Sequence, residues 1–320
     1  MKVLITGANG FIGSHICDEL IKNKYKVIGL VRKTSNIRYL KNKSVELRYG
    51  EITKKETLKG LFKDIDVVVH SAATVEIDDS KKAFLINAEA TKNVVDLSVE
   101  ENVKKFIYIS SQAAIGPSLF NNFKTEKDTP FPVSVYGKSK LRGEKEVLKR
   151  KDNIISIIIR PSAIFGPRDR ETFVLFNSLK HGFIPLTGYK EKYFPFIYVK
   201  DFVKIVNFFI QWNGKTGEIF NIGDKKIYPY SSVFRLIGRI MNIKLHRYPF
   251  PITETFFFYI IPFIKRYLPS IINRDKMREF RHSYWFISSK KFDKICKIEY
   301  TNIKQAIEET IRWYKDEKWL

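Results

Sequence analysis

Cysteine is scarce in this chain. The 320 residues include only two cysteines, Cys17 and Cys296, and neither has a nearby cysteine or a pair of histidines beside it. This scarcity excludes a disulfide framework and a structural zinc site, so we expect no metal ion. A chain with free thiols fits a reducing compartment, and we expect a cytoplasmic location.

The sequence also lacks a long hydrophobic run. The longest strongly apolar stretch, residues 256–264, is interrupted by Pro262, and a membrane-spanning helix needs about 20 apolar residues. Met1 is followed directly by the strand-like residues Val3, Leu4 and Ile5, with no signal-peptide pattern. We therefore expect neither a transmembrane helix nor a secretory signal.

Acidic residues are outnumbered by basic ones. The chain has 57 lysines and arginines against 34 acids, a formal net charge of +23. The basic residues are spread along the chain without a block of five or six, so a general composition bias accounts for them and we expect no nucleic-acid partner. The charge can still attract anionic cofactors, substrates or membrane surfaces.

Short apolar runs alternate with amphipathic stretches in the first two thirds of the chain. Continuously apolar strands separated by helices indicate a parallel sheet covered on both faces. We therefore predict an α/β fold with a doubly wound parallel sheet. The expected strands are residues 2–5, 26–31, 45–49, 67–70, 105–109 and 154–159, and the expected helices include 12–22 and 91–100.

After Pro167 the pattern becomes less regular. Residues 197–199 and 218–221 resemble further strands around a helix at 201–212, and a last helix covers 303–314. No flexible linker separates the parts. We predict a dinucleotide-binding domain of residues 1–167 plus about 197–223. A smaller α/β substrate lobe of 168–196 plus 224–320 completes the prediction.

Three glycines follow the first strand and open the first helix. Gly7, Gly10 and Gly13 are each three residues apart. Glycines at these places allow a tight turn and the close approach of a pyrophosphate, which the amino end of the helix attracts. The position after a strand is the context that this motif requires, so the turn predicts dinucleotide binding.

A phenol and an ammonium group follow the fifth strand. Tyr136 and Lys140 are four residues apart, so they share a helix face, and a nearby ammonium favours the phenolate. Tyr136 can then exchange a proton with a carbonyl or an alcohol. Ser110 and Ser111 end the fifth strand, at the sheet edge where open α/β folds bind ligands.

These motifs resemble the extended short-chain dehydrogenase/reductase family, the NAD-dependent epimerase/dehydratase superfamily. Similar segments include His70 to Ala73, Asn87 to Thr91, Arg160 to Pro167, Tyr198 to Asp201 and Asn221 to Gly223. The resemblance implies that Ser111 polarises the substrate oxygen, Tyr136 exchanges the proton, and Lys140 tunes Tyr136 and holds the nicotinamide ribose. The cofactor-binding set is then Gly7, Asn9, Gly10, Phe11, Ile12, Gly13, Arg32, Ala72, Tyr136 and Lys140.

The end of the second strand bears on the choice of cofactor. NAD sites usually place an acid there to bind the ribose hydroxyls, but no acid occurs between Glu19 and Glu46. The guanidinium of Arg32 suits the 2′-phosphate of NADP, although Arg32 also fits the basic composition. We therefore favour NADP(H) over NAD(H).

Departures from the family pattern bear on the substrate. Ser162 and Ala163 replace an asparagine common in nucleotide-sugar enzymes, and residues 193–196 are aromatic where those enzymes often carry an arginine. Both departures favour an apolar or aromatic substrate and the dihydroflavonol-reductase and 3β-hydroxysteroid-dehydrogenase-like branch. The leading hypothesis is an NADP(H)-dependent oxidoreductase. The alternatives are a nucleotide-sugar epimerase or dehydratase with tightly bound NAD, and a non-catalytic dinucleotide-binding protein.

Residues 252–268 form a segment in which an aromatic run is followed by two basic residues. Phenylalanines surround Pro262, and Lys265 and Arg266 come directly after residue 264. We predict that this segment forms an apolar lid beside the substrate cleft or a peripheral surface that contacts anionic lipids. A homodimer contact and ordinary packing are the alternatives.

Overall fold

The computed structural model describes residues 1–41, 43–75, 79–180, 182, 190–224, 226–245 and 273–320. The aromatic segment 252–268, predicted above as a lid or membrane contact, lies outside these residues. The described residues include no helix with both the length and the apolar composition needed to cross a membrane.

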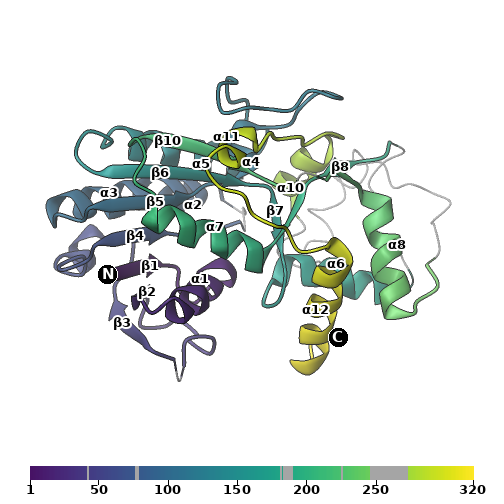
Figure 1. Ribbon diagram of the computed structural model, residues 1–320, viewed down its shortest axis with the longest axis horizontal. Helices are drawn as coiled ribbons and strands as arrows, with labels where there is room; N and C mark the ends of the chain where they lie inside the picture. The colour runs from purple at the N-terminus through teal and green to yellow at the C-terminus, as the bar shows by residue number, and fades with distance from the viewer. Residues whose placement is uncertain (42, 76–78, 181, 183–189, 225, 246–272) are drawn as a thin grey trace.

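A seven-stranded parallel sheet forms the centre of the molecule, in the order β10-β6-β5-β4-β1-β2-β3 (Figure 1). The predicted doubly wound sheet is therefore confirmed, with small shifts at the strand ends. The strands are β1 (Lys2–Thr6), β2 (Lys26–Val31), β3 (Val45–Tyr49), β4 (Val67–His70), β5 (Lys105–Ile109), β6 (Ile155–Pro161) and β10 (Glu218–Ile222).

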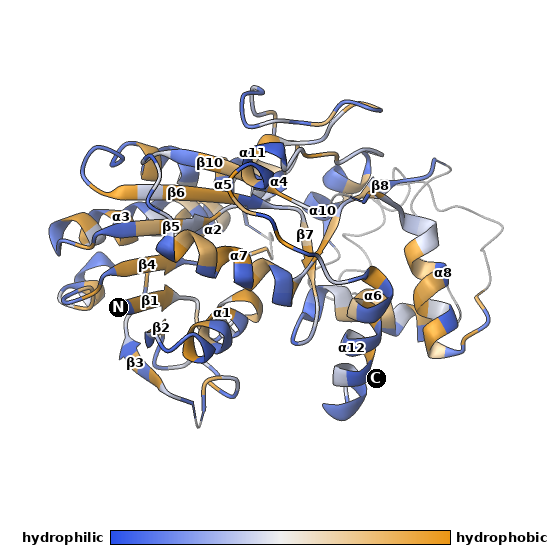
Figure 2. Cartoon of the chain, in the orientation of Figure 1, coloured by the Kyte–Doolittle hydropathy of each residue, from blue (hydrophilic) through white to orange (hydrophobic). Residues whose placement is uncertain are grey.

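Helices cover both faces of this sheet. On one face α1 (Phe11–Lys22) packs beside α7 (Val199–Gln211), and on the other lie α3 (Ala90–Glu100) and α5 (Val135–Leu148). Neighbouring strand residues point to opposite faces, so Val3 and Ile5 join the core of the first face and Leu4 joins the second. The inner strands β1, β4, β5 and β6 are mostly apolar because both of their faces are buried, whereas the edge strand β3 alternates apolar and charged residues (Figure 2).

Smaller elements gather beyond the carboxyl ends of the strands, where α6 and α12 pack around α8 (Figure 1). The predicted strand at residues 197–199 is found as β9, which pairs with β7 outside the main sheet. These elements are α6 (Arg170–Lys180), α8 (Tyr230–Met241), α10 (Arg274–Phe280), α11 (Lys290–Asp293), α12 (Ile303–Asp316), β7 (Ala163–Phe165), β8 (Tyr193–Phe194), β9 (Phe196–Tyr198) and β11 (Tyr228–Pro229).

Short helical turns complete the chain around the strand ends. They are η1 (Lys55–Leu58), α2 (Ser80–Phe84), the π-helical turn η2 (Leu85–Glu89) and α4 (Gln112–Ile115). The loop after α4 is hydrogen-bonded to the C-terminal region. Ser118 N–H donates to the carbonyl of Tyr284, and Lys124 N–H donates to the carbonyl of Phe286. This loop lies within the predicted dinucleotide-binding domain but contacts the predicted substrate lobe. The division of the chain into these two domains stays a prediction.

A buried ion pair ties α5 to β6. The guanidinium of Arg160 donates to both carboxylate oxygens of Glu144, at 2.8 and 2.6 Å, and both side chains are almost fully buried. The hydroxyl of Ser110 donates to the same carboxylate at 2.5 Å. Each charge therefore depends on the other, because neither has water to replace a lost partner.

We predict that Glu144→Ala lowers the free energy of unfolding by about 3–5 kcal/mol, because it leaves the Arg160 guanidinium buried and unpaired. Urea denaturation measures the loss. The control is Glu100→Ala, which removes an exposed ion pair with Lys55 that is also 2.6 Å long. An exposed pair contributes less than about 1 kcal/mol, so equal losses in the two variants would contradict the prediction.

Candidate active site

A cleft of about 580 Å³ opens at the carboxyl ends of the central strands. It lies where the strand order reverses beside β1, the place where open α/β sheets bind ligands. All ten residues that we predicted to bind the cofactor line this cleft: Gly7, Asn9, Gly10, Phe11, Ile12, Gly13, Arg32, Ala72, Tyr136 and Lys140.

The glycine turn brings three backbone segments into contact. Gly7 has a φ of +66°, and its carbonyl accepts a hydrogen bond of 2.9 Å from Gly10 N–H. A Cβ atom on Gly13 would lie 2.2 Å from the Gly7 oxygen, and a Cβ on Gly7 would lie 2.8 Å from the Cα of Ala72. Side chains at Gly7 and Gly13 would therefore push these segments apart, and α1 begins directly beside the turn.

Beneath the turn, a buried histidine links three elements. His70 at the end of β4 hydrogen-bonds the hydroxyls of Thr6 (2.7 Å) and Thr91 (3.0 Å). Thr6 also accepts from Ala72 N–H at 3.2 Å, which fixes the backbone that faces Gly7. Burial, with a smaller effect of Lys140, lowers the pKa of His70 to about 3, so the ring is neutral and structural.

Ser110 and Ser111 directly follow β5, and their hydroxyls bind different partners. Ser111 caps α4, where its Oγ accepts from Ala113 N–H, and it also hydrogen-bonds the phenol of Tyr136. The hydroxyl of Ser110 instead donates to Glu144 at 2.5 Å, and Ser110 is the one of the two serines in the lining of the cleft. Of the two, Ser111 is therefore the serine that contacts Tyr136, and its catalytic role stays a prediction.

Lys140 lies deep in the cleft on α5. Its Nζ donates to the carbonyl of Ile109 at 2.6 Å and lies 4.3 Å from the centre of the Tyr108 ring. Burial lowers the pKa of Lys140 to about 7, although Glu144 opposes the shift. A cation here is therefore held by a carbonyl and an aromatic face rather than by a carboxylate.

The expectation that a neighbouring ammonium lowers the pKa of Tyr136 is wrong for this structure. Burial raises the pKa of this half-buried phenol, and the carboxylates of Glu171 and Glu279 raise it further. Ser111 and Lys276 lower the pKa, but by less than the other groups raise it. The phenol is consequently held in its protonated form.

A charged group faces Tyr136 from the C-terminal elements. Lys276 Nζ on α10 lies 3.3 Å from Glu279 on the same helix and 4.0 Å from Glu171 on α6. Glu171 lines the cleft with Tyr136. The sequence analysis missed these three residues, because nothing in their spacing connects α6 or α10 with the strand ends.

The far end of the cleft is formed by the ends of β2 and β3. Arg32 is exposed and closes a short turn with Ser35, whose Oγ accepts from Arg32 N–H at 3.1 Å. Glu51 and Thr53 line the cleft beyond β3 and were also missed. Their position directly after a predicted strand was the signal that could have found them, since parallel strands end at the same edge.

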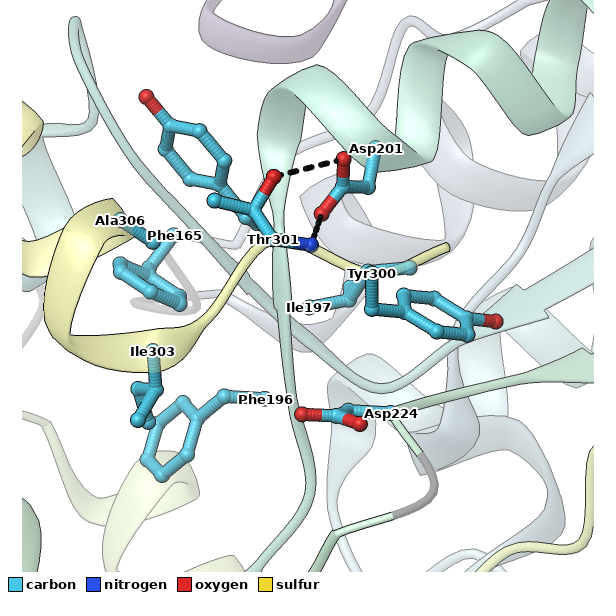
Figure 3. A pocket seen from close by; sticks show the side chains of 10 residues that line it. Phe165, Phe196, Ile197, Asp201, Asp224, Tyr300, Thr301, Ile303 and Ala306 are labelled. Carbon is cyan, nitrogen blue, oxygen red and sulfur yellow. Dashed lines mark hydrogen bonds between the residues drawn. The ribbon is translucent and has the colours of Figure 1, made fainter. Parts of the chain in front are cut away.

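A second hollow, of about 10 Å³, lies between β9 and the start of α12 (Figure 3). This is room for about one water molecule. In Figure 3 the carboxylate of Asp201 accepts hydrogen bonds from the backbone N–H (2.7 Å) and the hydroxyl (3.0 Å) of Thr301. Asp201, from a motif identified in the sequence, therefore anchors the C-terminal segment, and the larger cleft is the candidate active site.

Comparison with known proteins shows the family of this chain. The sequence matches the NAD dependent epimerase/dehydratase family over residues 3–223. The "uncharacterized UDP-glucose epimerase YtcB" of Bacillus subtilis (strain 168) is 30% identical over 264 residues, which cover 76% of this chain and 82% of that protein. A "sterol-4-alpha-carboxylate 3-dehydrogenase, decarboxylating" of Dictyostelium discoideum is 27% identical over 245 residues, 73% of this chain and 74% of that one.

A solved structure also has a similar fold. The crystal structure of a UDP-glucose 4-epimerase with UDP-glucose, from Thermotoga maritima, superimposes with a TM-score of 0.81 at 21% identity, over 99% of this chain and 100% of that chain. The match to the family spans the whole central sheet and the cleft. The chain belongs to the NAD dependent epimerase/dehydratase family of oxidoreductases and epimerases.

Proposed function

We propose that this protein is an NADP(H)-dependent oxidoreductase that interconverts a ketone and an alcohol on an apolar or aromatic small molecule. The observation that carries the proposal is one continuous cleft with the glycine turn in its lining and Tyr136 beside Ser111 and Lys140. The predicted cytoplasmic location, the two-domain division and a homodimer are parts of the same proposal.

The residues of the cleft fit a nicotinamide dinucleotide. The side-chain-free surface at Gly7, Gly10 and Gly13 leaves room for a pyrophosphate against the backbone, and the amino end of α1 provides the positive end of a helix dipole. The dinucleotide supplies or accepts a hydride when it is bound. Lys140 is buried and lines the same cleft, and its ammonium group would bind a ribose hydroxyl of the dinucleotide.

The protein's own residues account for the proton. Tyr136 Oη is held protonated by burial and by Glu171 and Glu279, so it can donate its proton to a developing alkoxide. The Ser111 hydroxyl lies beside that phenol and can donate a hydrogen bond to the same substrate oxygen. A protonated phenol fits the direction from ketone to alcohol.

Arg32 supports the preference for NADP(H). Its side chain is exposed at the end of β2 and lines the cleft, where an NAD site would place a carboxylate. A guanidinium forms paired hydrogen bonds with a phosphate, which suits the 2′-phosphate of NADP.

Aromatic packing supports an apolar substrate. Phe194 on β8 lies 5.5 Å from the ring of Tyr230 and 5.9 Å from that of Phe280, the last residue of α10. The adjoining residues of α10 carry the charged group that acts on Tyr136. The aromatic cluster thus includes a residue of α10, the helix whose charges act on Tyr136.

A nucleotide-sugar epimerase or dehydratase is the second candidate. Two carboxylates and an ammonium group near Tyr136 can accept and donate hydrogen bonds to sugar hydroxyls. The similarity to a UDP-glucose epimerase also favours this candidate. Incubation with NADPH and a panel of apolar ketones, and separately with UDP-sugars, decides between the two. Turnover of UDP-sugars alone would reject the proposed function.

We predict that Gly10→Val abolishes NADPH binding while the protein remains folded. A Cβ at Gly10 would be 3.2 Å from the Gly7 oxygen, which the backbone can tolerate, but the valine would occupy the place of the pyrophosphate. Fluorescence titration measures binding and circular dichroism the fold. The control is Gly223→Val, outside the cleft, with its nearest neighbour at 3.3 Å. Unchanged affinity in folded Gly10→Val would refute the assignment.

Arg32→Asp should reverse the preference from NADPH to NADH, because it places an anion against the 2′-phosphate and an acceptor against ribose hydroxyls. Dissociation constants for both cofactors measure the change. Lys33→Asp is the matched control, since Lys33 is exposed beside Arg32 but does not line the cleft. If the parent protein binds NADH as tightly as NADPH, the preference is wrong.

Tyr136→Phe should lower kcat by about 10²–10⁴-fold without abolishing NADPH binding, because it removes the proton donor and leaves the glycine turn intact. Steady-state kinetics with the best substrate of the panel checks the loss. Tyr25→Phe, which removes an exposed hydroxyl bound by Gln211, should keep parental turnover. Near-parental turnover of Tyr136→Phe would exclude the phenol as proton donor.

A further inference from the structure

The first turn of α5, which carries Tyr136, is held by a residue far along the chain. The carboxylate of Asp275 on α10 accepts a hydrogen bond of 2.7 Å from Val135 N–H and one of 3.0 Å from Tyr136 N–H. The two residues are 139 and 140 positions away in the sequence. The two amides that begin the helix of the proton donor are therefore bound by a helix of the C-terminal region.

The other amides of this turn are bound locally. Ser134 caps the helix, its Oγ accepting from Gly137 N–H at 2.9 Å and its carbonyl accepting from Lys138 N–H at 3.0 Å. The first amides of a helix have no partner inside the helix and need one from elsewhere. Local groups thus satisfy Gly137 and Lys138, whereas Val135 and Tyr136 depend on Asp275.

A second contact joins the same two helices. The hydroxyl of Ser134 donates to the Glu279 carboxylate at 2.7 Å, so both ends of α10 are tied to the start of α5. Lys276 and Glu279 on α10 are also among the charges that act on Tyr136. The helix α10 therefore contacts the start of α5 and contributes to the charges around the phenol.

We propose that Asp275 is a positioning residue for Tyr136: its carboxylate caps the catalytic helix from the C-terminal region, so that the proton donor is aligned only when α10 is docked. This inference rests on the proposed function in one respect, that Tyr136 is the proton donor. Asp275 is suited to the role because it is 5% exposed, which keeps competing water away from both hydrogen bonds.

Charge and geometry favour a carboxylate at this position. Its two oxygens match two successive amides, and the negative charge lies at the positive end of the α5 dipole. Arg278, 3.1 Å from Asp275 and partly exposed, balances the charge from the solvent side. An asparagine retains one acceptor oxygen and loses the charge, and an alanine loses both acceptors.

Hydrogen–deuterium exchange of the full-length protein at single-amide resolution tests the cap without any substrate. In Asp275→Ala the amides of Val135 and Tyr136 should exchange at least about tenfold faster, and in Asp275→Asn one of the two should. Asn302→Ala is the matched control, because it removes a side-chain cap from α12, where Asn302 accepts from Lys304 N–H at 2.9 Å. Unchanged exchange at Val135 and Tyr136 in Asp275→Ala would overturn the proposal.

Kinetics with the best substrate of the panel tests the consequence. A displacement of about 1 Å can cost about 10²-fold in rate, so Asp275→Ala should lower kcat by about 10–100-fold and leave the dissociation constant for NADPH unchanged. Asp275→Asn should lie between Asp275→Ala and the parent, and Asn302→Ala should match the parent. A global folding defect would instead reduce cofactor binding and turnover together. Unaltered kcat in Asp275→Ala with faster exchange would reject the positioning role.

The two proposals fail in different ways. Should Tyr136→Phe keep its turnover, the proposed function is wrong, and the exchange measurement still decides whether Asp275 caps α5. If Asp275→Ala does not fold, Asp275→Asn provides both readouts: faster exchange at one amide with a smaller loss of kcat supports the proposal, and parental values in both reject it.

Discussion

The cleft depends on the close approach of three main-chain segments. Gly7, Gly13 and Ala72 meet at distances that leave no room for side chains at the two glycines. The Thr6 hydroxyl hydrogen-bonds the His70 ring and accepts from Ala72 N–H, and these bonds hold the strand ends in this arrangement. Because the first helix begins there, its amino end faces the cleft. A wider separation would place the backbone out of reach of a phosphate.

The proton-transfer end of the cleft is assembled differently. Tyr136 and Lys140 lie on one face of α5, but their surroundings come from elsewhere: Lys140 is bound by the β5 carbonyl of Ile109, and Tyr136 is surrounded by charges on α6 and α10. The glycine-turn end of the cleft is thus formed by the strand ends of the sheet and the start of α1. The proton-transfer end of the cleft requires the C-terminal elements to pack against α5.

This division explains the success of the sequence predictions. The strands of the main sheet were predicted within one or two residues, because its inner strands are mostly apolar and the edge strand β3 alternates apolar and charged residues. The glycine turn and the Tyr136–Lys140 pair were found because each is local, with a spacing that has a direct geometric meaning. Glu171, Lys276, Asp275 and Glu279 were missed, since no local pattern shows which distant helix contacts α5.

The sequence by itself determined the doubly wound sheet, the place of the dinucleotide cleft and the identity of Tyr136 and Lys140. Those features follow from hydrophobic periodicity and from spacings within one element. Only the tertiary structure decided the protonation state of Tyr136. We expected Lys140 to lower the pKa of this phenol, but burial and the carboxylates of Glu171 and Glu279 raise it. A pKa depends on the dielectric surroundings and on charges a few ångströms away, and those are set by which elements pack together.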